Sequence, residues 1–432
     1  MYNKFYIKKN LVSILLFSAL VLFSCASPPY NAERVRRIPE DFFGIASFRT
    51  DLNSRDFELL DELGVVWQRR TCRWGSLERE RGVWDFSSWD AYVSDSRAAG
   101  KKNLAILAYD TAWLHGENGT SGKINSEELP LFINYVEQVV TRYRGQIEAY
   151  EIWNEPNWIS WKGSKKEFIE LTLAAAKKIR EIDPQAKILA GAFWRVPASY
   201  IRQLFSSGVM DYVDAVSFHP YAVNPSGSVK LFDNLAKILD EFSYRGEIWV
   251  TEVGYPTSGW YPTTVKEKDF PGVIIKTLAG LAIRDIKVLL WYELKDAYNR
   301  GEAPSKTDSE YYFGISYLDH TKKNGFNAWA LCGQNLAGTY YRPDWPAREG
   351  LPDRTVSLCF EGREKNVLIL WNESGGEVRA RANLPGTNPV IYDISTGLGR
   401  IMDRNEEILI TKEPVFITWS GNAWSRPLVE KL

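Results

Sequence analysis

Residues 150–157 read YEIWNEPN, a short apolar run that contains one acid, Glu151, and stops at an amide, a second acid and a proline. A similar run, WVTEVGYP at 249–256, carries an acid, Glu252, shortly before a glycine and a proline. Apolar runs of this length that stop at polar or turn-forming residues are typical of buried strands. We therefore predict two core strands whose ends present carboxylates.

Six further runs of this kind occur in the same part of the chain, and amphipathic stretches of helical period separate most of them. Continuous apolar strands that alternate with helices indicate a parallel sheet covered on both faces. Eight such units in sequence favour a (β/α)8 barrel, an α/β fold, over residues 41–340. The predicted strands span 42–47, 65–70, 103–109, 147–153, 187–193, 215–219, 248–253 and 288–293, and the predicted helices 55–63, 88–99, 127–143, 165–182, 229–242, 272–284 and 327–337.

The chain changes character after the last predicted helix. Residues 341–355 are rich in Pro, Arg and Gly, and we interpret them as a linker. Short alternating strands separated by Gly, Asn and Asp turns follow, which predicts a small C-terminal β-sandwich over 356–432. These strands are expected at 357–360, 367–371, 378–384, 390–394, 408–410 and 416–419.

The N-terminal segment is predicted to be a targeting signal. Lysines precede an apolar stretch, 11–23, which has signal-peptide length and is too short to span a membrane as a helix. It ends in LFSC, which resembles a bacterial lipobox. We therefore predict a lipoprotein-type signal peptide over 1–24, lipidation at Cys25, a tether over 25–40, and a location at the bacterial cell envelope with membrane contact through the lipid anchor only. The alternative is secretion after cleavage at a nearby small residue.

Composition argues against several function classes. The chain has 53 basic and 54 acidic residues among 432, a formal net charge of -1, which gives no electrostatic basis for nucleic-acid binding. Its 17 Trp, 22 Tyr and 20 Phe provide flat faces that stack on sugars, although a large aromatic core is an equally good explanation.

The cysteines and histidines do not predict a metal site. Beyond the signal, Cys72, Cys332 and Cys359 lie far apart without metal-ligand spacing. Buried free thiols are favoured, while a disulfide between two of them stays open. Three histidines and no HExxH motif argue against catalytic zinc, so we expect no metal and no cofactor.

Polar residues at predicted strand ends are the candidate site residues, because chemistry in such barrels takes place at the carboxyl ends of the strands. The strands that end near Glu155 and Glu252 are the fourth and seventh, which face one another across the barrel mouth. Retaining glycoside hydrolysis requires two carboxylates about 5–5.5 Å apart: one attacks the anomeric carbon and the other protonates the leaving oxygen. The strand-end set comprises Arg69, Arg70, Asn154, Glu155, His219, Tyr221, Glu252, Trp291 and Glu293.

A family resemblance rests on several motifs in a fixed order. IWNEPN at 152–157, SFHPY at 217–221 and VTEVGYP at 250–256 resemble the 4/7 superfamily (clan A) of retaining glycoside hydrolases, most closely glycoside hydrolase families 39 and 5. GVVWQRRTCRW at 64–74 and KVLLWYELKD at 287–296 add to the resemblance, which covers about residues 41–340. The C-terminal sandwich resembles the accessory β-domain often fused to such barrels.

The resemblance implies a role for each acid and its neighbours. Glu252 would be the nucleophile and Glu155 the general acid/base. Two close carboxylates cannot both ionise at low cost, so the one without a cation keeps its proton. Arg69 is implied as the cation that keeps Glu252 ionised. Asn154 would hydrogen-bond the sugar 2-hydroxyl, where contacts strengthen in the transition state. Tyr221 is implied to hydrogen-bond the nucleophile.

Other residues have weaker assignments. His219 is expected to line the same pocket as Tyr221, and Trp291 is our predicted sugar platform. Glu151 is interpreted as a buried structural acid that pairs with Arg69 or Arg70, because it lies deeper on the strand of Glu155. Glu293 is interpreted as structural. Tryptophans near other strand ends or in loops are equally compatible with sugar subsites and loop core: Trp113, Trp158, Trp161, Trp194 and Trp260.

Together these features predict a lipid-anchored retaining glycosidase that cleaves O-glycosidic bonds of a β-linked oligosaccharide or polysaccharide. The sequence does not distinguish an exo-acting, β-xylosidase-like enzyme from an endo-acting glycanase, since loops set pocket depth. Two alternatives stay open. One is a transglycosylase that uses the same residues, and the other is a non-catalytic surface lipoprotein that binds glycans. A pair of buried acids in salt bridges is the non-functional explanation for Glu155 and Glu252.

Overall fold

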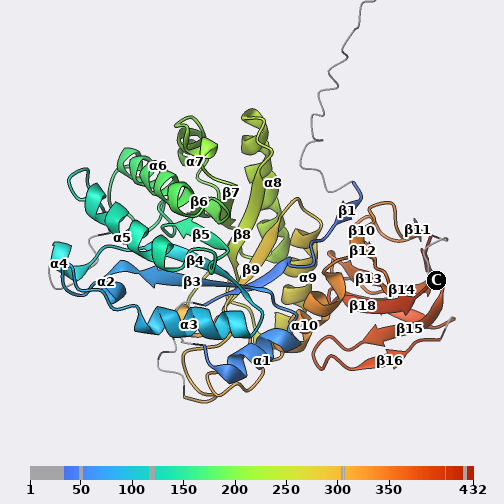
Figure 1. The fold of residues 1–432 in the computed structure, drawn as a ribbon. Coiled ribbons are helices and arrows are strands. Elements are labelled where there is room, and N and C mark those ends of the chain that lie inside the picture. The colour runs from blue at the N-terminus through green and yellow to red at the C-terminus, as the bar shows by residue number, and fades with distance from the viewer. Residues whose placement is uncertain are drawn as a thin grey trace, which may run out of the picture.

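The structure, a computed structural model, describes residues 34–47, 52–115, 122–302, 305, 307–403, 405–421 and 426–432. Eight parallel strands close into a barrel in sequence order, and helices surround it (Figure 1). The predicted (β/α)8 fold is therefore confirmed. The barrel strands are β2 (Phe43–Ala46), β3 (Trp67–Arg73), β4 (Lys102–Ala108), β5 (Ala149–Ile152), β6 (Lys187–Trp194), β7 (Ala215–His219), β8 (Glu247–Val253) and β9 (Val288–Tyr292).

The long helices form where the amphipathic stretches predict them. Helix α6 begins at a capping box, in which the Ser164 side chain accepts from the Glu167 amide and the Glu167 carboxylate accepts from the Ser164 amide. The long helices are α1 (Ser54–Glu62), α3 (Ser87–Ala98), α5 (Leu129–Arg142), α6 (Lys165–Ile182), α8 (Pro225–Glu241), α9 (Phe270–Ala282) and α10 (Gly325–Leu336). Short helices that we did not predict are α2 (Trp74–Leu77), α4 (Ala112–His115) and α7 (Ala198–Phe205).

Side chains of the barrel strands alternate between the interior and the surrounding helices. On β9, Val288, Leu290 and Tyr292 belong to the cluster inside the barrel. Leu289 and Trp291 instead belong to the larger cluster formed with the helices. Strand β9 therefore aims every second side chain at the barrel axis, as strand geometry requires.

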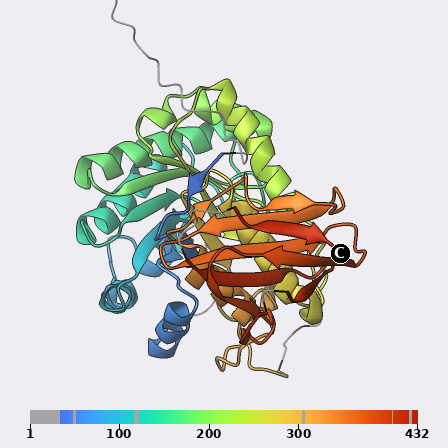
Figure 2. The same cartoon turned by 90° about the vertical axis from the view of Figure 1, so that its right-hand side faces the viewer.

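The C-terminal region is a two-sheet sandwich, as predicted (Figure 2). The larger sheet has the order β1-β10-β12-β13-β18-β15-β16, and the smaller has the order β11-β19-β14-β17. The larger sheet comprises β1 (Arg36–Arg37), β10 (Tyr340–Tyr341), β12 (Thr355–Glu361), β13 (Lys365–Asn372), β18 (Val415–Ser420), β15 (Thr387–Tyr392) and β16 (Gly399–Ile401). The smaller comprises β11 (Ala347–Glu349), β19 (Leu428–Lys431), β14 (Val378–Asn383) and β17 (Glu407–Ile410).

Two stretches that we expected to be connections contribute strands to the sandwich. Strand β1 lies in the predicted tether 25–40 and pairs with β10. The predicted linker 341–355 contains β11, which pairs with β19. These strands are two or three residues long and rich in charged residues, so they carry no alternating apolar pattern. They are strands because their backbones pair with β10 and β19, and their side chains give no sign of it. The domain limits themselves stay predictions.

The barrel and the sandwich share apolar packing. Helices α9 and α10 lie between the barrel strands and the larger sheet (Figure 1). One continuous cluster contains Trp329 of α10 and Ile369 of β13. The Lys276 ammonium lies 5.8 Å from the centre of the Trp371 ring, and the Asn327 side chain donates to the Ser395 carbonyl at 2.9 Å. The sandwich is thus attached to the side of the barrel.

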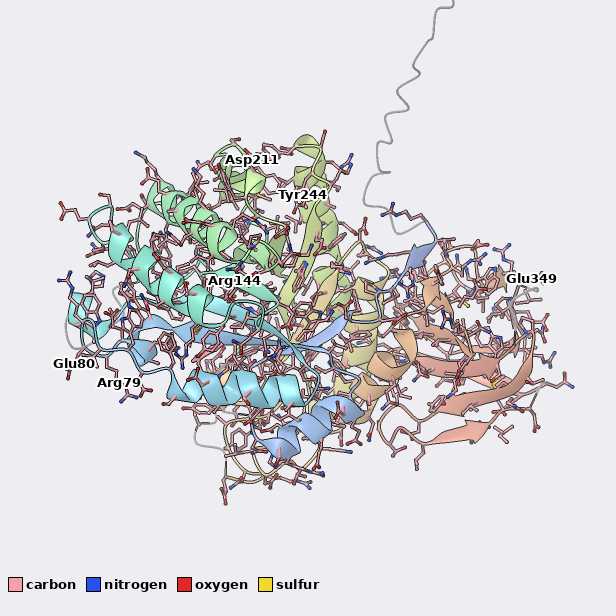
Figure 3. All side chains as sticks on the ribbon, viewed as in Figure 1. Arg79, Glu80, Arg144, Asp211, Tyr244 and Glu349 are labelled. Carbon is pink, nitrogen blue, oxygen red and sulfur yellow. The ribbon has the colours of Figure 1, made fainter. Side chains whose placement is uncertain are left out.

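Two further sequence predictions concern burial. Cys72, Cys332 and Cys359 are free and buried, as favoured, so they form no disulfide with one another. No helix in the described ranges is both long and apolar enough to cross a membrane. Charged side chains such as Arg79 and Glu349 lie at the edges of the molecule (Figure 3). Cys25 and the predicted signal peptide lie outside the described residues, so lipidation stays a prediction.

Candidate active site

A pocket of about 440 Å³ opens at the carboxyl ends of the barrel strands, and we refer to it as the mouth pocket. Its walls come from residues at or just after the ends of β3 to β9, which meet at one face because the strands are parallel. Both predicted catalytic acids line it, together with Asn154 and Tyr221. The carboxyl ends of the strands therefore place both candidate carboxylates in one cavity.

Glu155 follows β5 in a constrained backbone conformation. Its φ is 44°, in the left-handed region that non-glycine residues rarely adopt. Pro156 disfavours the right-handed helical conformation at the residue before it. The Glu155 amide donates to the Ala192 carbonyl at 3.0 Å, and the Ser160 hydroxyl donates to the Glu155 carbonyl at 2.9 Å. Such strain persists only where surrounding contacts over-determine it, which is common at active sites.

A bulge in β6 supplies the carbonyl that holds Glu155. The register of β6 against β7 shifts between Ala190 and Phe193. Gly191 has a φ of 121°, and a Cβ at this position would lie 2.6 Å from the Ser217 carbonyl oxygen. Only glycine fits this position without distortion. The bulge thus presents the Ala192 carbonyl to the Glu155 amide.

A second bulge positions the other acid. The register of β8 against β9 shifts between Val250 and Val253, so Thr251 and Glu252 lie opposite a single residue. Neighbours on a regular strand point to opposite faces. Here both reach His219: the Thr251 hydroxyl lies 3.1 Å from Nε2, and a Glu252 carboxylate oxygen lies 3.7 Å from Nδ1. Bulges beside active sites commonly re-aim side chains in this way.

The two acids are close and differently partnered. A carboxylate oxygen of Glu155, one of Glu252 and a ring nitrogen of His219 all lie within 4.8 Å of one another. Glu155 pairs with His219, whose Nδ1 is 2.8 Å from its Oε1. Glu252 accepts a hydrogen bond from the Tyr221 hydroxyl at 3.0 Å and contacts the Arg69 guanidinium. The cation therefore touches only one of the two acids.

Arg69 joins three site residues through its planar fork of donors. Nε donates to Glu151 at 2.6 Å, Nη2 donates to the Asn154 side-chain oxygen at 2.6 Å, and Nη1 donates to Glu252. Both Arg69 and Glu151 are buried. The pairing of Glu151 is thus with Arg69, while the Arg70 guanidinium lies 4.8 Å from the centre of the Tyr92 ring. With its oxygen engaged, Asn154 keeps its amide NH₂ group as a donor.

The surroundings shift the pKa values of the two acids in opposite directions. Burial raises the pKa of Glu155, the charge of Glu252 adds to the increase, and the hydrogen bond with His219 offsets it only in part. Burial also acts to raise the pKa of Glu252, but the attraction of His219 and Arg69 and the hydrogen bonds from Arg69 and Tyr221 outweigh it, so this pKa is lowered. Burial and the charge of Glu252 raise the pKa of Tyr221, which stays a neutral donor.

This arrangement can hold one protonated and one ionised carboxyl in the same cavity. Pairs whose environments separate their pKa values are the usual sign of an acid and a base with distinct roles. Glu155, His219 and Glu252 are also close enough to serve as ligands to one metal ion. The Arg69 guanidinium occupies one side of Glu252 and opposes a cation there. The expectation of a metal-free site stays a prediction.

Trp291 corrects the predicted sugar platform. It is fully buried and packs against Tyr255, which follows β8, and Phe270 of α9, with ring centres 6.2 and 6.3 Å away. Tyr292, its neighbour on β9, lines the mouth pocket instead. Trp291 sits on the outer face of the strand, so it cannot stack on a sugar in the pocket. Glu293 is buried and does not line the pocket either.

The other tryptophans separate into distinct groups. Trp158 and Trp194 line the mouth pocket and stack on each other. Trp161 is buried and packs on Trp153 and Phe168, and Trp113 packs on Trp74 and does not line the pocket. Trp260 is 86% exposed and does not line the pocket.

Some site residues were not among our predictions. Thr251 contacts His219 through the bulge, which no sequence pattern signals. Tyr109 lines the mouth pocket and was the last residue of a predicted strand, so the strand-end rule could have found it. Two of the other unpredicted lining residues are Arg73, at the end of β3, and Glu310, in a short 3₁₀ helix. The rest lie on loops: Asp110, Gly122, Ile159, Ser160, Lys162, Tyr261 and Phe313.

Comparison with known proteins gives distant relatives. No protein-family model matches the chain. Two curated proteins of Phanerodontia chrysosporium, endo-1,4-beta-xylanase C and endo-1,4-beta-xylanase A, are each 24% identical over 162 residues, which is 34% of this chain. The matches span 39% and 38% of those proteins, or about two-fifths of their length.

Solved structures resemble the chain over most of its length. A family 39 glycoside hydrolase from the gut symbiont Bacteroides cellulosilyticus WH2 has a TM-score of 0.73 at 18% identity, covering 91% of this chain and 83% of that one. A GH39 beta-xylosidase from Caulobacter crescentus scores 0.62 at 15% identity, covering 91% and 99%. A family 30 subfamily 8 xylanase from Clostridium acetobutylicum scores 0.61 at 12% identity, covering 89% and 97%. At these identities the likeness establishes the shared fold.

Proposed function

We propose that the protein is a retaining glycoside hydrolase that cleaves O-glycosidic bonds of a β-linked glycan or glycoside. One observation carries the proposal: two carboxyl groups, with oxygens within 4.8 Å of each other, have pKa values shifted apart in one pocket. The separation fits the short distance that a covalent intermediate requires and leaves too little room for the water of an inverting mechanism. The named activities of the matched relatives support a β-linked substrate.

In the first half-reaction, the ionised Glu252 carboxylate attacks the anomeric carbon. Glu155 gives its proton to the glycosidic oxygen, the carbon–oxygen bond breaks, and the leaving group departs as an alcohol. Arg69 and Tyr221 hold Glu252 in its ionised form and in position. The NH₂ group of Asn154 binds the sugar 2-hydroxyl, where a hydrogen bond strengthens as the anomeric carbon gains positive charge.

In the second half-reaction, water replaces the leaving group. Glu155 is now ionised, because it has lost its proton and the charge of Glu252 has been removed by the ester bond. It takes a proton from water while the water oxygen attacks the anomeric carbon, and the ester bond to Glu252 breaks. The net stereochemistry is retention, and both carboxyl groups return to their starting states.

The test is hydrolysis of a broad panel of β-linked oligo- and polysaccharides and of 4-nitrophenyl β-glycosides. The mature protein and its Glu252→Ala variant are compared in parallel. Release by the first and not the second supports the nucleophile, and proton NMR of the first product should show the β anomer. Release of the α anomer would refute retention. Oligosaccharide binding with no release over hours would support the glycan-binding alternative.

A further inference from the structure

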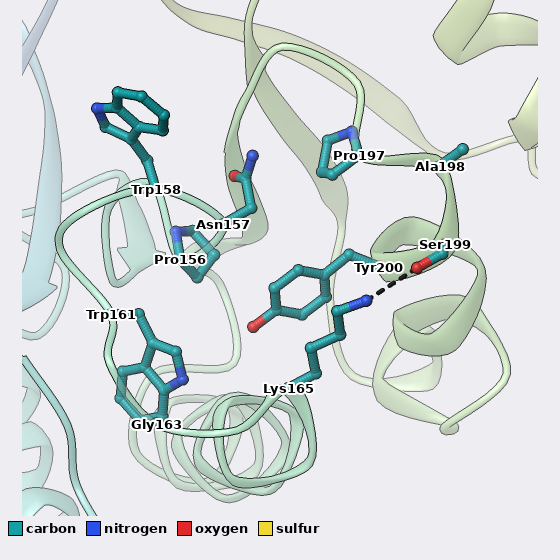
Figure 4. A pocket seen from close by; sticks show the side chains of 10 residues that line it. All are labelled: Pro156, Asn157, Trp158, Trp161, Gly163, Lys165, Pro197, Ala198, Ser199 and Tyr200. Atoms are coloured by element: carbon teal, nitrogen blue, oxygen red, sulfur yellow. Dashed lines mark hydrogen bonds between the residues drawn. The ribbon is translucent and has the colours of Figure 1, made fainter.

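A second hollow of about 450 Å³ adjoins the mouth pocket, and we refer to it as the side hollow (Figure 4). Its walls are the loop after β5, the first residue of α6, and Pro197 together with the first three residues of α7. Three aromatic side chains line it: Trp158, Trp161 and Tyr200. Lys165 is the one charged residue among its lining residues. Aromatic faces beside polar donors form a surface suited to sugar rings.

The two cavities meet at Trp158, which lines both. Trp158 comes three residues after Glu155, and its amide donates to the Glu155 carbonyl at 3.0 Å. Pro156 and Asn157, which also follow Glu155, line the side hollow. The side hollow therefore lies on the side of the mouth pocket where Glu155 stands.

The shared wall is a fixed aromatic platform. The rings of Trp158 and Trp194 are stacked, with centres 4.3 Å apart and planes 25° from parallel. Asn157 clamps Trp194 by donating to its carbonyl at 2.8 Å and accepting from its amide at 3.0 Å. The Arg195 guanidinium lies 5.6 Å from the Trp194 ring centre. Trp158 is 49% exposed, so a ligand can reach it without rearrangement of the platform.

The inner wall carries an unused donor. Tyr200 is only 3% exposed, and its buried hydroxyl has no hydrogen-bond partner in the described part of the chain. Figure 4 shows this hydroxyl directed between Trp161 and Pro156. The Lys165 ammonium lies 5.4 Å from the centre of the Tyr200 ring and donates to the Ser199 hydroxyl at 2.8 Å. An unpaired buried hydroxyl destabilises the fold, and a hydrogen bond to a ligand hydroxyl would remove that penalty.

The reaction direction identifies the occupant. Glu155 protonates the oxygen of the leaving group, so the leaving group extends past Glu155 and toward Trp158. We propose that the side hollow binds a sugar unit of the leaving-group part of an oligosaccharide, with Trp158 as its platform and the Tyr200 hydroxyl as a hydrogen-bond partner. This inference rests on the proposed function. It assigns the substrate class: glycan chains with several units on the leaving side are preferred over glycosides with small leaving groups.

The experiment compares substrates that differ only on the leaving side. Oligosaccharides of two to six units from the glycan that the panel identifies are set against the 4-nitrophenyl glycoside of the same sugar. Wild type should show kcat/KM that rises with chain length. Tyr200→Phe removes one hydroxyl and keeps the ring, so kcat/KM should fall about 5- to 10-fold for the long oligosaccharides, mainly through KM, and stay unchanged for the 4-nitrophenyl glycoside.

Matched variants complete the design. Lys165→Met, on the exposed rim of the side hollow, should also weaken only long substrates, and it guards against misfolding of a buried variant. Trp260→Ala removes an exposed tryptophan that lines neither cavity and should change nothing. Two results would overturn the inference: a wild-type kcat/KM that does not depend on chain length, or an equal loss of kcat/KM on both substrate types in Tyr200→Phe. In either case, cleavage of the 4-nitrophenyl glycoside would still support the proposed function. Failure to cleave any substrate would refute both the proposed function and this inference.

Discussion

Arg69→Met should move the acid limb of the pH–rate profile upward. The guanidinium contacts Glu252, which must be ionised to attack the anomeric carbon. Two opposite charges about 4 Å apart interact by about 4 kcal/mol at an effective dielectric constant of about 20, which corresponds to about 3 pKa units. The same cation also serves Glu151, so we expect a shift of about 1–3 units, the usual range for a carboxylate beside an arginine.

The same substitution should affect stability in a pH-dependent way. Glu252 has a lowered pKa in the folded protein, so its contribution to stability is present above its unfolded pKa of about 4.3 and is lost as pH falls through the folded pKa. Arg69→Met removes this contribution and leaves Glu151 buried without its cation. We expect a loss of about 3–5 kcal/mol in the free energy of unfolding near neutral pH, and a smaller loss in acid.

The assay is kcat/KM for a 4-nitrophenyl β-glycoside between about pH 3 and pH 8, together with urea unfolding at about pH 7 and pH 4. Arg70→Met is the matched control, since it makes the same chemical change one residue along the strand, where the guanidinium lies over Tyr92. Arg69→Lys keeps the charge but cannot bridge three partners, so its shift should be smaller. An acid limb that stays in place in folded Arg69→Met, or that moves equally in Arg70→Met, would refute the reasoning.

Further predictions concern other parts of the site. Glu155→Gln should lower kcat/KM for unactivated glycosides by at least about 100-fold and largely spare kcat/KM for 4-nitrophenyl glycosides, whose leaving group needs no proton, while their kcat falls because Glu155 is also the base of the second half-reaction; equal losses of kcat/KM on both would contradict an acid role. Gly191→Ala should cost about 1–3 kcal/mol of unfolding free energy and lower kcat, because its Cβ would lie 2.6 Å from the Ser217 carbonyl; unchanged urea curves would contradict this. Chelation with EDTA should leave kcat/KM unchanged, and a loss restored by one divalent metal would reassign the site. Trp291→Phe should lower stability and leave KM unchanged, and a higher KM alone would restore its role as a sugar platform.

The repeating unit of the barrel was predictable because each piece carries its own signal. Apolar runs, helical periodicity and glycine stops are local, and eight repetitions compensate for errors in any one of them. Helix α7 was not predicted, because its eight residues between β6 and the next turn are too few to show a clear helical period. The three-residue strand β11 escaped because its pairing with β19 is set by tertiary contacts rather than by its side chains.

The candidate acids were predictable for a related reason. Glu155 follows β5 and Glu252 is the last residue but one of β8, and parallel strands of a barrel place their carboxyl ends on one face regardless of the details of packing. The bulge at Thr251 was not predictable, since an extra residue in a strand leaves no mark in an apolar sequence, while the lone Gly191 within an apolar strand is the one sequence sign of the bulge in β6. The two bulges nevertheless decide how Glu155 is held and how Glu252 approaches His219.

The error at Trp291 shows where local reasoning stops. On β9 every residue is apolar, so two opposite assignments of inward and outward faces fit the sequence equally well. Registry resolves the choice: Ala46 pairs with both Arg69 and Tyr292, so these three lie at one level of the barrel. Arg69 points inward to the acids, so Tyr292, which is in register with it, also points inward. The side chain before it on the strand, Trp291, therefore points outward. A single charged residue fixes the orientation of two neighbouring strands, but only when strand registry is known, and registry is a property of the closed barrel rather than of any one strand.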